Sequence, residues 1–157
     1  MVEQQRRGRA IAMSADEVDS YLAEQRTCRV ATVGHDGRPH VSALWFVWDG
    51  ADLWLNSLSK SQRWTDLRRD PRVAVVIDDG IEFLDLRGVE LSGRVEVVGE
   101  VPRTAEPNDV LAPVEAAFAA KYSPEYGFHP DGRHAWLRMR PDKVVSWDFT
   151  KIPRPGA

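Results

Sequence analysis

The chain has 157 residues, 43% of them hydrophobic and 29% charged, so its composition is that of one folded domain rather than a disordered segment. Its 21 basic and 24 acidic residues give a net charge of −3, which offers no reason to expect nucleic acid or an anionic membrane as a partner. No apolar run is long enough to span a membrane and no secretory signal is recognisable, so we expect a cytoplasmic protein. The single cysteine, Cys28, excludes an intrachain disulfide, and its apolar surroundings predict a buried, inert thiol.

The first third of the chain predicts an arm, a helix and a run of strands. Residues 1–13 are polar and show no period, which is typical of a flexible N-terminal arm. Ser14 and Glu17 have the spacing of a capping box and predict a helix over 14–25. Three runs rich in β-branched and aromatic residues follow, separated by Asp-Gly turns that favour tight hairpins. They predict an antiparallel meander of strands at 28–33, 40–48 and 53–57.

The remainder of the chain predicts two further helices and longer strands. Helical spacing over 59–69, with serines before it and Pro71 after it, predicts one helix, and apolar spacing over 110–122 predicts another. The segment 89–98 alternates apolar and polar residues and has Gly93 in its middle, as in a strand of a curved sheet. Further strands are expected at 73–77, 135–140 and 143–149.

About seven mostly antiparallel strands with three helices favour a mainly β fold. A small closed or nearly closed β-barrel is the architecture that leaves the fewest strand edges exposed. The expected organisation is an arm over 1–13, one barrel domain over 14–152 and a tail over 153–157.

Familiar signatures of catalysis are missing: the sequence has no G-x-S-x-G, no P-loop, no G-x-G-x-x-G and no H-E-x-x-H. His129 and His134 flank Asp131 in a loop rich in glycine and proline, where they could in principle bind a metal. No further ligand follows at a regular spacing, so we predict no metal site there. Motifs alone therefore identify no catalytic residue.

The segment 56–63, Asn-Ser-Leu-Ser-Lys-Ser-Gln-Arg, is the strongest candidate for a binding site. It runs from a strand end into a helix N-terminus, where backbone N–H groups lack partners and the helix dipole is positive. Its serine hydroxyls can donate to oxyanions, and Lys60 and Arg63 are expected on one exposed helical face. The segment favours a bound anion, most plausibly a phosphate, and the alternative is a serine-capped helix with a solvated basic face.

Six tryptophans are many for a chain of this length. Five lie on or beside expected strands: Trp45, Trp48, Trp54, Trp64 and Trp147. A small barrel cannot bury all of these rings in its own lumen. Some are therefore expected in a subunit interface or against a flat ring in a pocket, while the others fill the core.

The order of these segments resembles the pyridoxamine 5′-phosphate oxidase-like, flavin-binding split-barrel superfamily. The resemblance covers about 14–149 and rests on the segments 29–33, 36–46, 59–64, 67–73 and 86–93. Within that superfamily the sequence is most similar to the branch that uses the deazaflavin coenzyme F420, known chiefly from actinobacteria. The resemblance implies a homodimer of split β-barrels with two cofactor sites in the grooves between the subunits.

The resemblance also implies which residues bind the cofactor. The phosphate-bearing tail would lie against Lys60, Ser61, Gln62 and Arg63, with Asn56, Ser57 and Ser59 nearby, and the ring would lie beside the strand of His40, Val41 and Ser42. Trp45 and Trp147 are further candidates for the pocket wall, and Arg68, Arg69 and Arg72 for the longer anionic tail of F420. His40 is either a proton donor or a structural histidine.

The implied function is an oxidoreductase in which reduced F420 donates a hydride to a small conjugated or heteroaromatic acceptor. The protein then needs only to position the acceptor over the ring and exclude water. FMN also presents a phosphate and a flat tricycle, so an FMN-dependent oxidase or reductase is the alternative. A third reading is a module that carries the cofactor or a tetrapyrrole without turnover. Pyridoxal-type substrates are not expected, because their set of Arg and His contacts has no match here.

Overall fold

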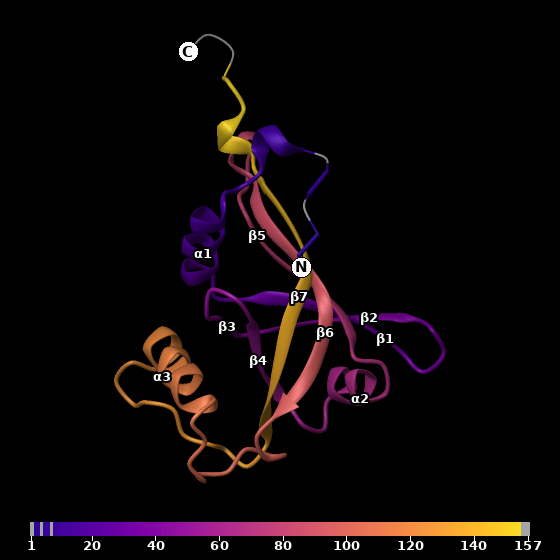
Figure 1. Ribbon diagram of the computed structural model, residues 1–157, viewed down its shortest axis with the longest axis vertical. Coiled ribbons are helices and arrows are strands. Elements are labelled where there is room, and N and C mark those ends of the chain that lie inside the picture. The colour runs from indigo at the N-terminus through magenta and orange to yellow at the C-terminus, as the bar shows by residue number, and fades with distance from the viewer. Residues whose placement is uncertain (1, 4, 7, 155–157) are drawn as a thin grey trace.

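The computed structural model describes residues 2–3, 5–6 and 8–154; the other residues of the expected arm and tail lie outside the described part. Within it the protein is mainly β, as the sequence predicted, with one antiparallel sheet of seven strands and three α-helices (Figure 1). The strands are β1 Cys28–Val33, β2 Pro39–Leu44, β3 Phe46–Trp48, β4 Leu53–Leu58, β5 Arg72–Asp79, β6 Arg87–Val98 and β7 His134–Asp148. The helices are α1 Ala15–Glu24, α2 Gln62–Arg69 and α3 Leu111–Tyr122.

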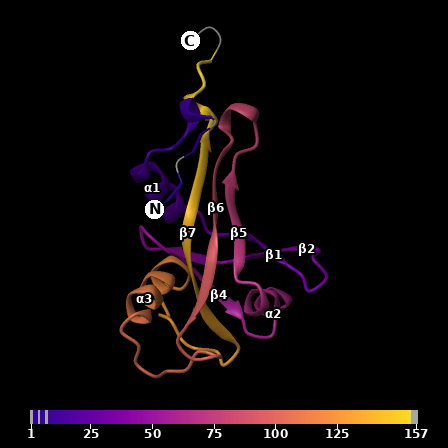
Figure 2. The ribbon, with the colours of Figure 1, turned by 45° about the vertical axis from the view of Figure 1, so that its right-hand side comes forward.

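The strands follow the order β2-β1-β5-β6-β7-β4-β3 across the sheet. Because β2 and β3 are consecutive in the chain but lie at opposite edges, the sheet must curl until its two edges approach each other. The long strands β5, β6 and β7 form one wall, and the β1–β2 hairpin projects away from it (Figures 1 and 2). The result is a curled half-barrel in which β2 passes beside β4 without pairing with it.

The expected strand at 40–48 is wrong, because the chain breaks at Trp45 into β2 and β3. The first part pairs with β1 and the second with β4, so two hairpins at opposite edges replace the expected three-stranded meander. The cause is closure of the sheet: one straight strand cannot maintain both ladders once the sheet bends between them. Trp45 marks the bend, and its side chain is 48% exposed.

The two strands expected at 135–140 and 143–149 are in fact the single strand β7. Its pairing with β6 continues past Pro141 through a register shift at Ser92/Gly93. A Cβ at Gly93 would lie 2.4 Å from the carbonyl oxygen of Arg140, so only glycine lets the two strands approach this closely. The mid-strand glycine thus allows the curvature that the sequence pattern predicted.

Two of the three helices begin at side-chain caps. α1 has the predicted capping box, in which Ser14 accepts from the Glu17 amide and Glu17 accepts from the Ser14 amide. α2 begins at Gln62, later than the expected 59, with Ser61 as its N-cap. α3 is fixed to the barrel by the Tyr122 hydroxyl, which accepts from the Phe46 amide and donates to the Arg26 carbonyl.

The barrel has one core inside and a second under α3. The inner cluster joins one face of the sheet to the apolar sides of α1 and α2 and contains Leu22, Leu55, Trp64, Ile77 and Leu91, among others. The second lies on the outer face of β3, β4 and β7 and contains Val47, Trp54, Leu111, Val114 and Trp136. β4 therefore separates the barrel lumen from the region beneath α3, and its successive side chains face different compartments.

The described residues of the arm run along β7. The Glu3 amide donates to the Asp142 carbonyl, and the Gln5 side chain bonds to the backbone of Ser146. None of the helices in the described ranges is long and apolar enough to cross a membrane.

Candidate functional site

The segment that favours an anion forms the connection from β4 into α2. Ser61 Oγ accepts from the Trp64 amide and donates to the Leu58 carbonyl, while Ser59 Oγ donates to the Arg133 carbonyl. These two hydroxyl protons are therefore used to shape the loop. An anion here would instead meet the nearby cations and the backbone amides at the start of α2 other than that of Trp64, which have no acceptor within the helix.

Arg63 is buried, contrary to the exposed position that the helical spacing predicted. It points away from the surface face that it was expected to share with Lys60, because its guanidinium enters the gap between β2 and β4. There Nε donates to Ser57 Oγ at 3.1 Å and Nη1 donates to Ser42 Oγ. Burial lowers the pKa of the guanidinium, and no carboxylate in the described ranges pairs with it. Arg63 thus places a positive charge, without a counter-ion among the described residues, at the gap between β2 and β4.

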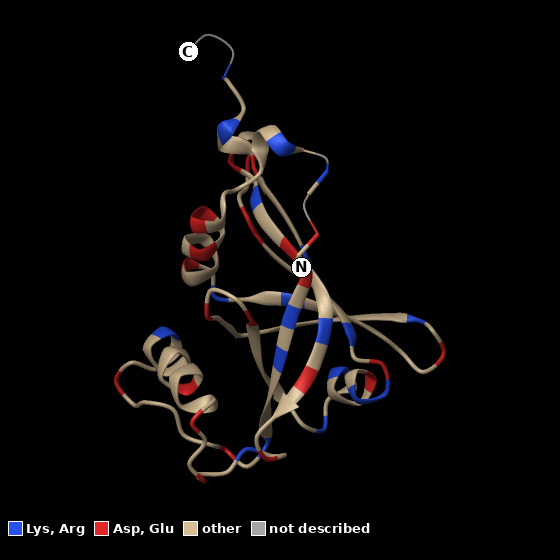
Figure 3. Cartoon of the chain, viewed as in Figure 1, with Lys and Arg blue, Asp and Glu red and all other residues tan. Residues whose placement is uncertain are grey.

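Lys60 lies at the surface in the loop before α2 and makes no hydrogen bond or ion pair with the described residues. α2 and this loop carry several Lys and Arg residues (Figure 3). Arg69 and Arg72 pair with Asp66 and Asp70, so among the three further arginines proposed for a cofactor tail only Arg68 has no ion pair within the described part.

Asp66 on α2 lies beside two of the predicted site residues, Gln62 and His40. Its carboxylate is fully buried and accepts from Thr32 Oγ1 at 2.9 Å and from Gln62 Nε2 at 2.7 Å, and His40 Nδ1 lies 3.8 Å away. Burial disfavours the ionised carboxyl, but these hydrogen bonds and the Arg69 charge outweigh it, so the pKa of Asp66 is lowered. His40 is thus held beside a buried anion.

β2 lies at an edge of the sheet, so backbone groups on its outer side have no neighbouring strand within the described fold. Val41 is 67% exposed on this strand, whereas Ser42 is half-buried and accepts the bond from Arg63. The edge of the strand predicted to lie beside the ring is therefore available to a ligand with donors and acceptors along its rim.

Asn56 lies on the outer side of β4, away from Ser57, which faces the barrel interior. Its Nδ2 atom is buried and has no acceptor within the described residues. Trp45 is close to the same cavity wall, whereas Trp147 covers Gly88, where a Cβ would lie 2.1 Å from the indole ring. Trp147 therefore fills space over a strand glycine and does not line the cavity that contains Asn56 and Trp45.

His129, in the 123–133 loop, and His134, at the start of β7, contact different partners. His134 Nδ1 lies 2.6 Å from Asp131 Oδ2, and His129 Nε2 lies 2.6 Å from the Tyr126 carbonyl. Burial of Asp131 opposes ionisation, but amide bonds from Arg133 and His134 prevail and lower its pKa to about 2. No cluster of three His, Cys, Asp or Glu able to hold a metal ion occurs among the residues described.

The family model for pyridoxamine 5′-phosphate oxidase matches residues 14–148, nearly the whole folded part of the chain. The chain belongs to this family. The superfamily resemblance inferred from the sequence segments is thereby confirmed. No curated protein matches the chain.

Solved structures similar to this family member span several descriptions. A conserved hypothetical protein from Mycobacterium tuberculosis is 32% identical, with a TM-score of 0.79 over 99% of this chain and 96% of that one. A structure described as an F420 reductase is 26% identical, with a TM-score of 0.60 over 80% of this chain and 94% of that one. An FAD-binding protein from Mesorhizobium loti shares the fold, with 21% identity and a TM-score of 0.64 over 86% of this chain and 93% of that one.

Sequence reasoning missed two parts of the site in this family member. Thr32 and Asp66, which contact His40 and Gln62, lie in an expected strand and an expected helix, and the sequence pattern gave them no role in the site. The 123–133 loop was considered only for metal binding, although it closes a cavity over Asn56. An orphaned buried amide is visible only in three dimensions, so no sequence signal could have identified it.

Proposed function

We propose that this protein is a homodimeric F420-dependent reductase that binds the cofactor's phosphate-bearing tail at the connection between β4 and α2. The observation that carries the proposal is the charge of Arg63, which is buried against two serine hydroxyls with no carboxylate partner in the described part of the chain. A buried cation without a counter-ion is costly, and a phosphate beside it would supply the missing charge. The similarity to an F420 reductase at 26% identity supports the deazaflavin over other flavin-type cofactors.

The residues fit such a cofactor in three respects. Lys60 and the first-turn amides of α2 supply donors for the tail next to Arg63. The unpaired edge of β2 supplies backbone groups for the polar rim of the ring, beside His40 and Ser42. Asp66 holds Gln62 and His40 in place between these two regions. Bound reduced F420 would supply the hydride, and the chain would orient the ring and keep water from it.

The test compares cofactor affinities of three variants by fluorescence titration with F420 and, separately, with FMN. Lys60→Ala and Arg63→Met each remove one charged hydrogen bond, worth about 1.5–3 kcal/mol, so each is expected to weaken F420 binding roughly tenfold to a hundredfold. Arg94→Ala removes an exposed cation on β6 that belongs to no proposed site, and it serves as the control. Thermal unfolding of Arg63→Met shows whether the buried substitution leaves the fold intact.

The outcomes separate the candidate functions. Tight F420 binding that depends on Lys60 and Arg63, with turnover of an enone, supports the reductase. Tighter binding of FMN than of F420 would indicate that the same site serves an FMN-dependent enzyme. Binding of F420 without turnover of any acceptor would indicate a carrier. Equal affinity in all three variants and the wild type would remove the proposed tail site.

A further inference from the structure

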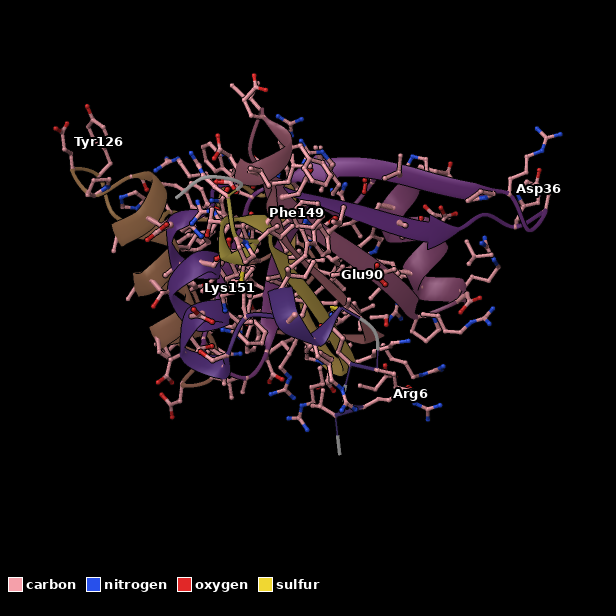
Figure 4. The ribbon with its side chains drawn as sticks, turned by 90° about the horizontal axis from the view of Figure 1, so that it is seen from above. Arg6, Asp36, Glu90, Tyr126, Phe149 and Lys151 are labelled. Carbon is pink, nitrogen blue, oxygen red and sulfur yellow. The ribbon has the colours of Figure 1, made fainter. Side chains whose placement is uncertain are left out.

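A cavity of about 490 Å³ lies between α3, the 123–133 loop and the outer face of β4, and we call it the α3 pocket. Leu44, Trp45, Phe118 and Phe128 form its apolar wall. The indole of Trp45 is fixed by stacking on Tyr122, with ring centroids 4.4 Å apart and planes 5° apart. This size and this aromatic lining suit a flat organic molecule. In a view from above, Tyr126 of the same loop lies at the end of the molecule opposite Asp36 of the β1–β2 turn (Figure 4).

The polar wall of the α3 pocket contains a donor without an acceptor. Asn56 lines the pocket, and its buried Nδ2 has no partner within the described residues. A buried N–H that lacks an acceptor costs about 1–3 kcal/mol, so a native protein rarely retains one without a use. An oxygen atom of a molecule in the pocket would complete this hydrogen bond.

A carboxylate–imidazole pair forms another part of the same wall. Asp131 is held by the amides of Arg133 and His134, and its second oxygen lies 2.6 Å from His134 Nδ1. This contact fixes the imidazole with Nδ1 toward the carboxylate, an arrangement in which a carboxylate orients a functional histidine. His134 Nε2 makes no hydrogen bond within the described part of the chain, and both His134 and Asp131 line the pocket.

Asn56 and His134 face the same side of the β4–β7 ladder. Asn56 is paired with Trp136, and Leu58 is paired with His134, so Asn56 and His134 are diagonal neighbours. Such neighbours lie about 7–8 Å apart, which is within reach of a single small molecule held against both side chains.

We propose that the α3 pocket binds the organic acceptor, a planar α,β-unsaturated ketone. Asn56 donates a hydrogen bond to the ketone's carbonyl oxygen, and His134 delivers the proton that the substrate gains during reduction. This inference rests on the proposed function. When a hydride from reduced F420 forms a C–H bond at the β-carbon, the π electrons of the C=C bond shift and the carbonyl oxygen gains negative charge, which Asn56 stabilises. Because Nδ1 faces Asp131 with its own proton, the donor is His134 as the imidazolium: its Nε2 proton passes to the α-carbon of the enolate, which gives the saturated ketone, and solvent then reprotonates Nε2 of the neutral imidazole. The ketone gains one hydride and one proton, and the cofactor loses two electrons.

The test uses 4-phenyl-3-buten-2-one as the probe and three variants: Asn56→Leu, His134→Gln and His35→Gln. His35 is exposed in the β1–β2 turn and provides the matched histidine control. Calorimetric titration of cofactor-free protein with the probe should show a dissociation constant raised about tenfold by Asn56→Leu, raised by less than that by His134→Gln and unchanged by His35→Gln. F420 affinity should stay within twofold in both histidine variants, and Asn56→Leu should weaken F420 binding less than it weakens probe binding. With F420 bound, His134→Gln should slow reduction of the probe about a hundredfold.

The fold of Asn56→Leu is checked by urea unfolding, where loss of an unpaired buried donor should leave the protein at least as stable as the wild type. Weakened F420 binding with unchanged probe binding in Asn56→Leu would overturn the assignment, since Asn56 would then belong to the cofactor. Full reduction rate in His134→Gln would overturn the role of that histidine. If the wild-type protein binds the probe but not F420, the proposed function is refuted, but the assignment of the α3 pocket as a binding site is retained. If it binds F420 but not the probe, only the assignment of the α3 pocket is refuted.

Discussion

Asp66 and Arg63, which are buried, and Asn56, whose Nδ2 atom is buried, differ in how their polar groups are paired. Asp66 is surrounded by donors from Thr32 and Gln62 and by the Arg69 charge. Arg63 has hydroxyl partners but no opposite charge, and Asn56 has an amide nitrogen with no partner within the described residues. Buried polar groups without partners are costly in a folded chain, so Arg63 and Asn56 identify where a ligand is expected. Asp66, whose carboxylate is fully paired, instead supports the structure around them.

Replacing Asp66 with asparagine should show this supporting role through pH. Because the folded-state pKa of Asp66 lies below the ordinary 3.8, its ionisation stabilises the fold above that pH, and the contribution is lost as pH falls through the lowered pKa. At pH 7 we expect Asp66→Asn to lower the melting temperature by roughly 5 °C, since about 2 kcal/mol of charged hydrogen bonding is lost in a domain of this size. Circular dichroism melts from pH 7 to pH 2.5 should show the difference from wild type shrinking as pH falls.

Asp142 is exposed, so Asp142→Asn provides the matched control for that series, and its melting temperature should equal that of the wild type at every pH. A melting difference for Asp66→Asn that stays constant down to the lowest pH would contradict a lowered pKa for this hydrogen-bonded carboxyl.

At the scale of elements, the sequence predicted local features well and their boundaries less well. The capping box of α1, the serine cap of α2 and the alternation in β6 depend on residues close in sequence, so each could be predicted. The break at Trp45 and the union of two expected strands into β7 depend on closure of the sheet, which brings distant strands together. Arg63 was misplaced for the same reason: its helical position was evident, but the gap between β2 and β4 that receives its guanidinium exists only in the curled sheet.

The bend between β6 and β7 provides a test at this scale. Gly93→Ala would place a methyl group 2.4 Å from the Arg140 carbonyl oxygen, a backbone atom that cannot rotate away. We expect a loss of about 2 kcal/mol in the free energy of unfolding, measured by urea denaturation, because the strands must separate at the bulge. Ser92→Ala, one residue earlier in the same strand, should change it by less than about 0.5 kcal/mol. If Gly93→Ala leaves the free energy of unfolding unchanged, the curvature of the sheet does not depend on this close approach of the two strands.

For the whole molecule, the two proposed binding regions lie on different sides of β4. The tail site uses Arg63 and Ser57 at the gap between β2 and β4, whereas the α3 pocket uses Asn56 on the outer face. The adjacent edge strand β2 exposes Val41 and connects to Trp45 in the pocket wall. A second subunit packed against β2 would cover this apolar edge and enclose a cofactor lying between the two regions.

The proposed dimer predicts that one substitution at β2 weakens both subunit assembly and F420 binding. Light scattering should give the wild type twice the chain mass of 17.7 kDa, and Val41→Asp should give the single-chain mass, because a carboxylate would be buried in the interface. The same variant should bind F420 at least tenfold more weakly, since each site needs both chains. Ile81→Asp makes the same apolar-to-acidic change at a side chain that is 94% exposed in the turn after β5, and should leave both mass and affinity unchanged. A Val41→Asp protein that remains dimeric, or a monomer with full F420 affinity, would show that β2 does not form a shared cofactor groove.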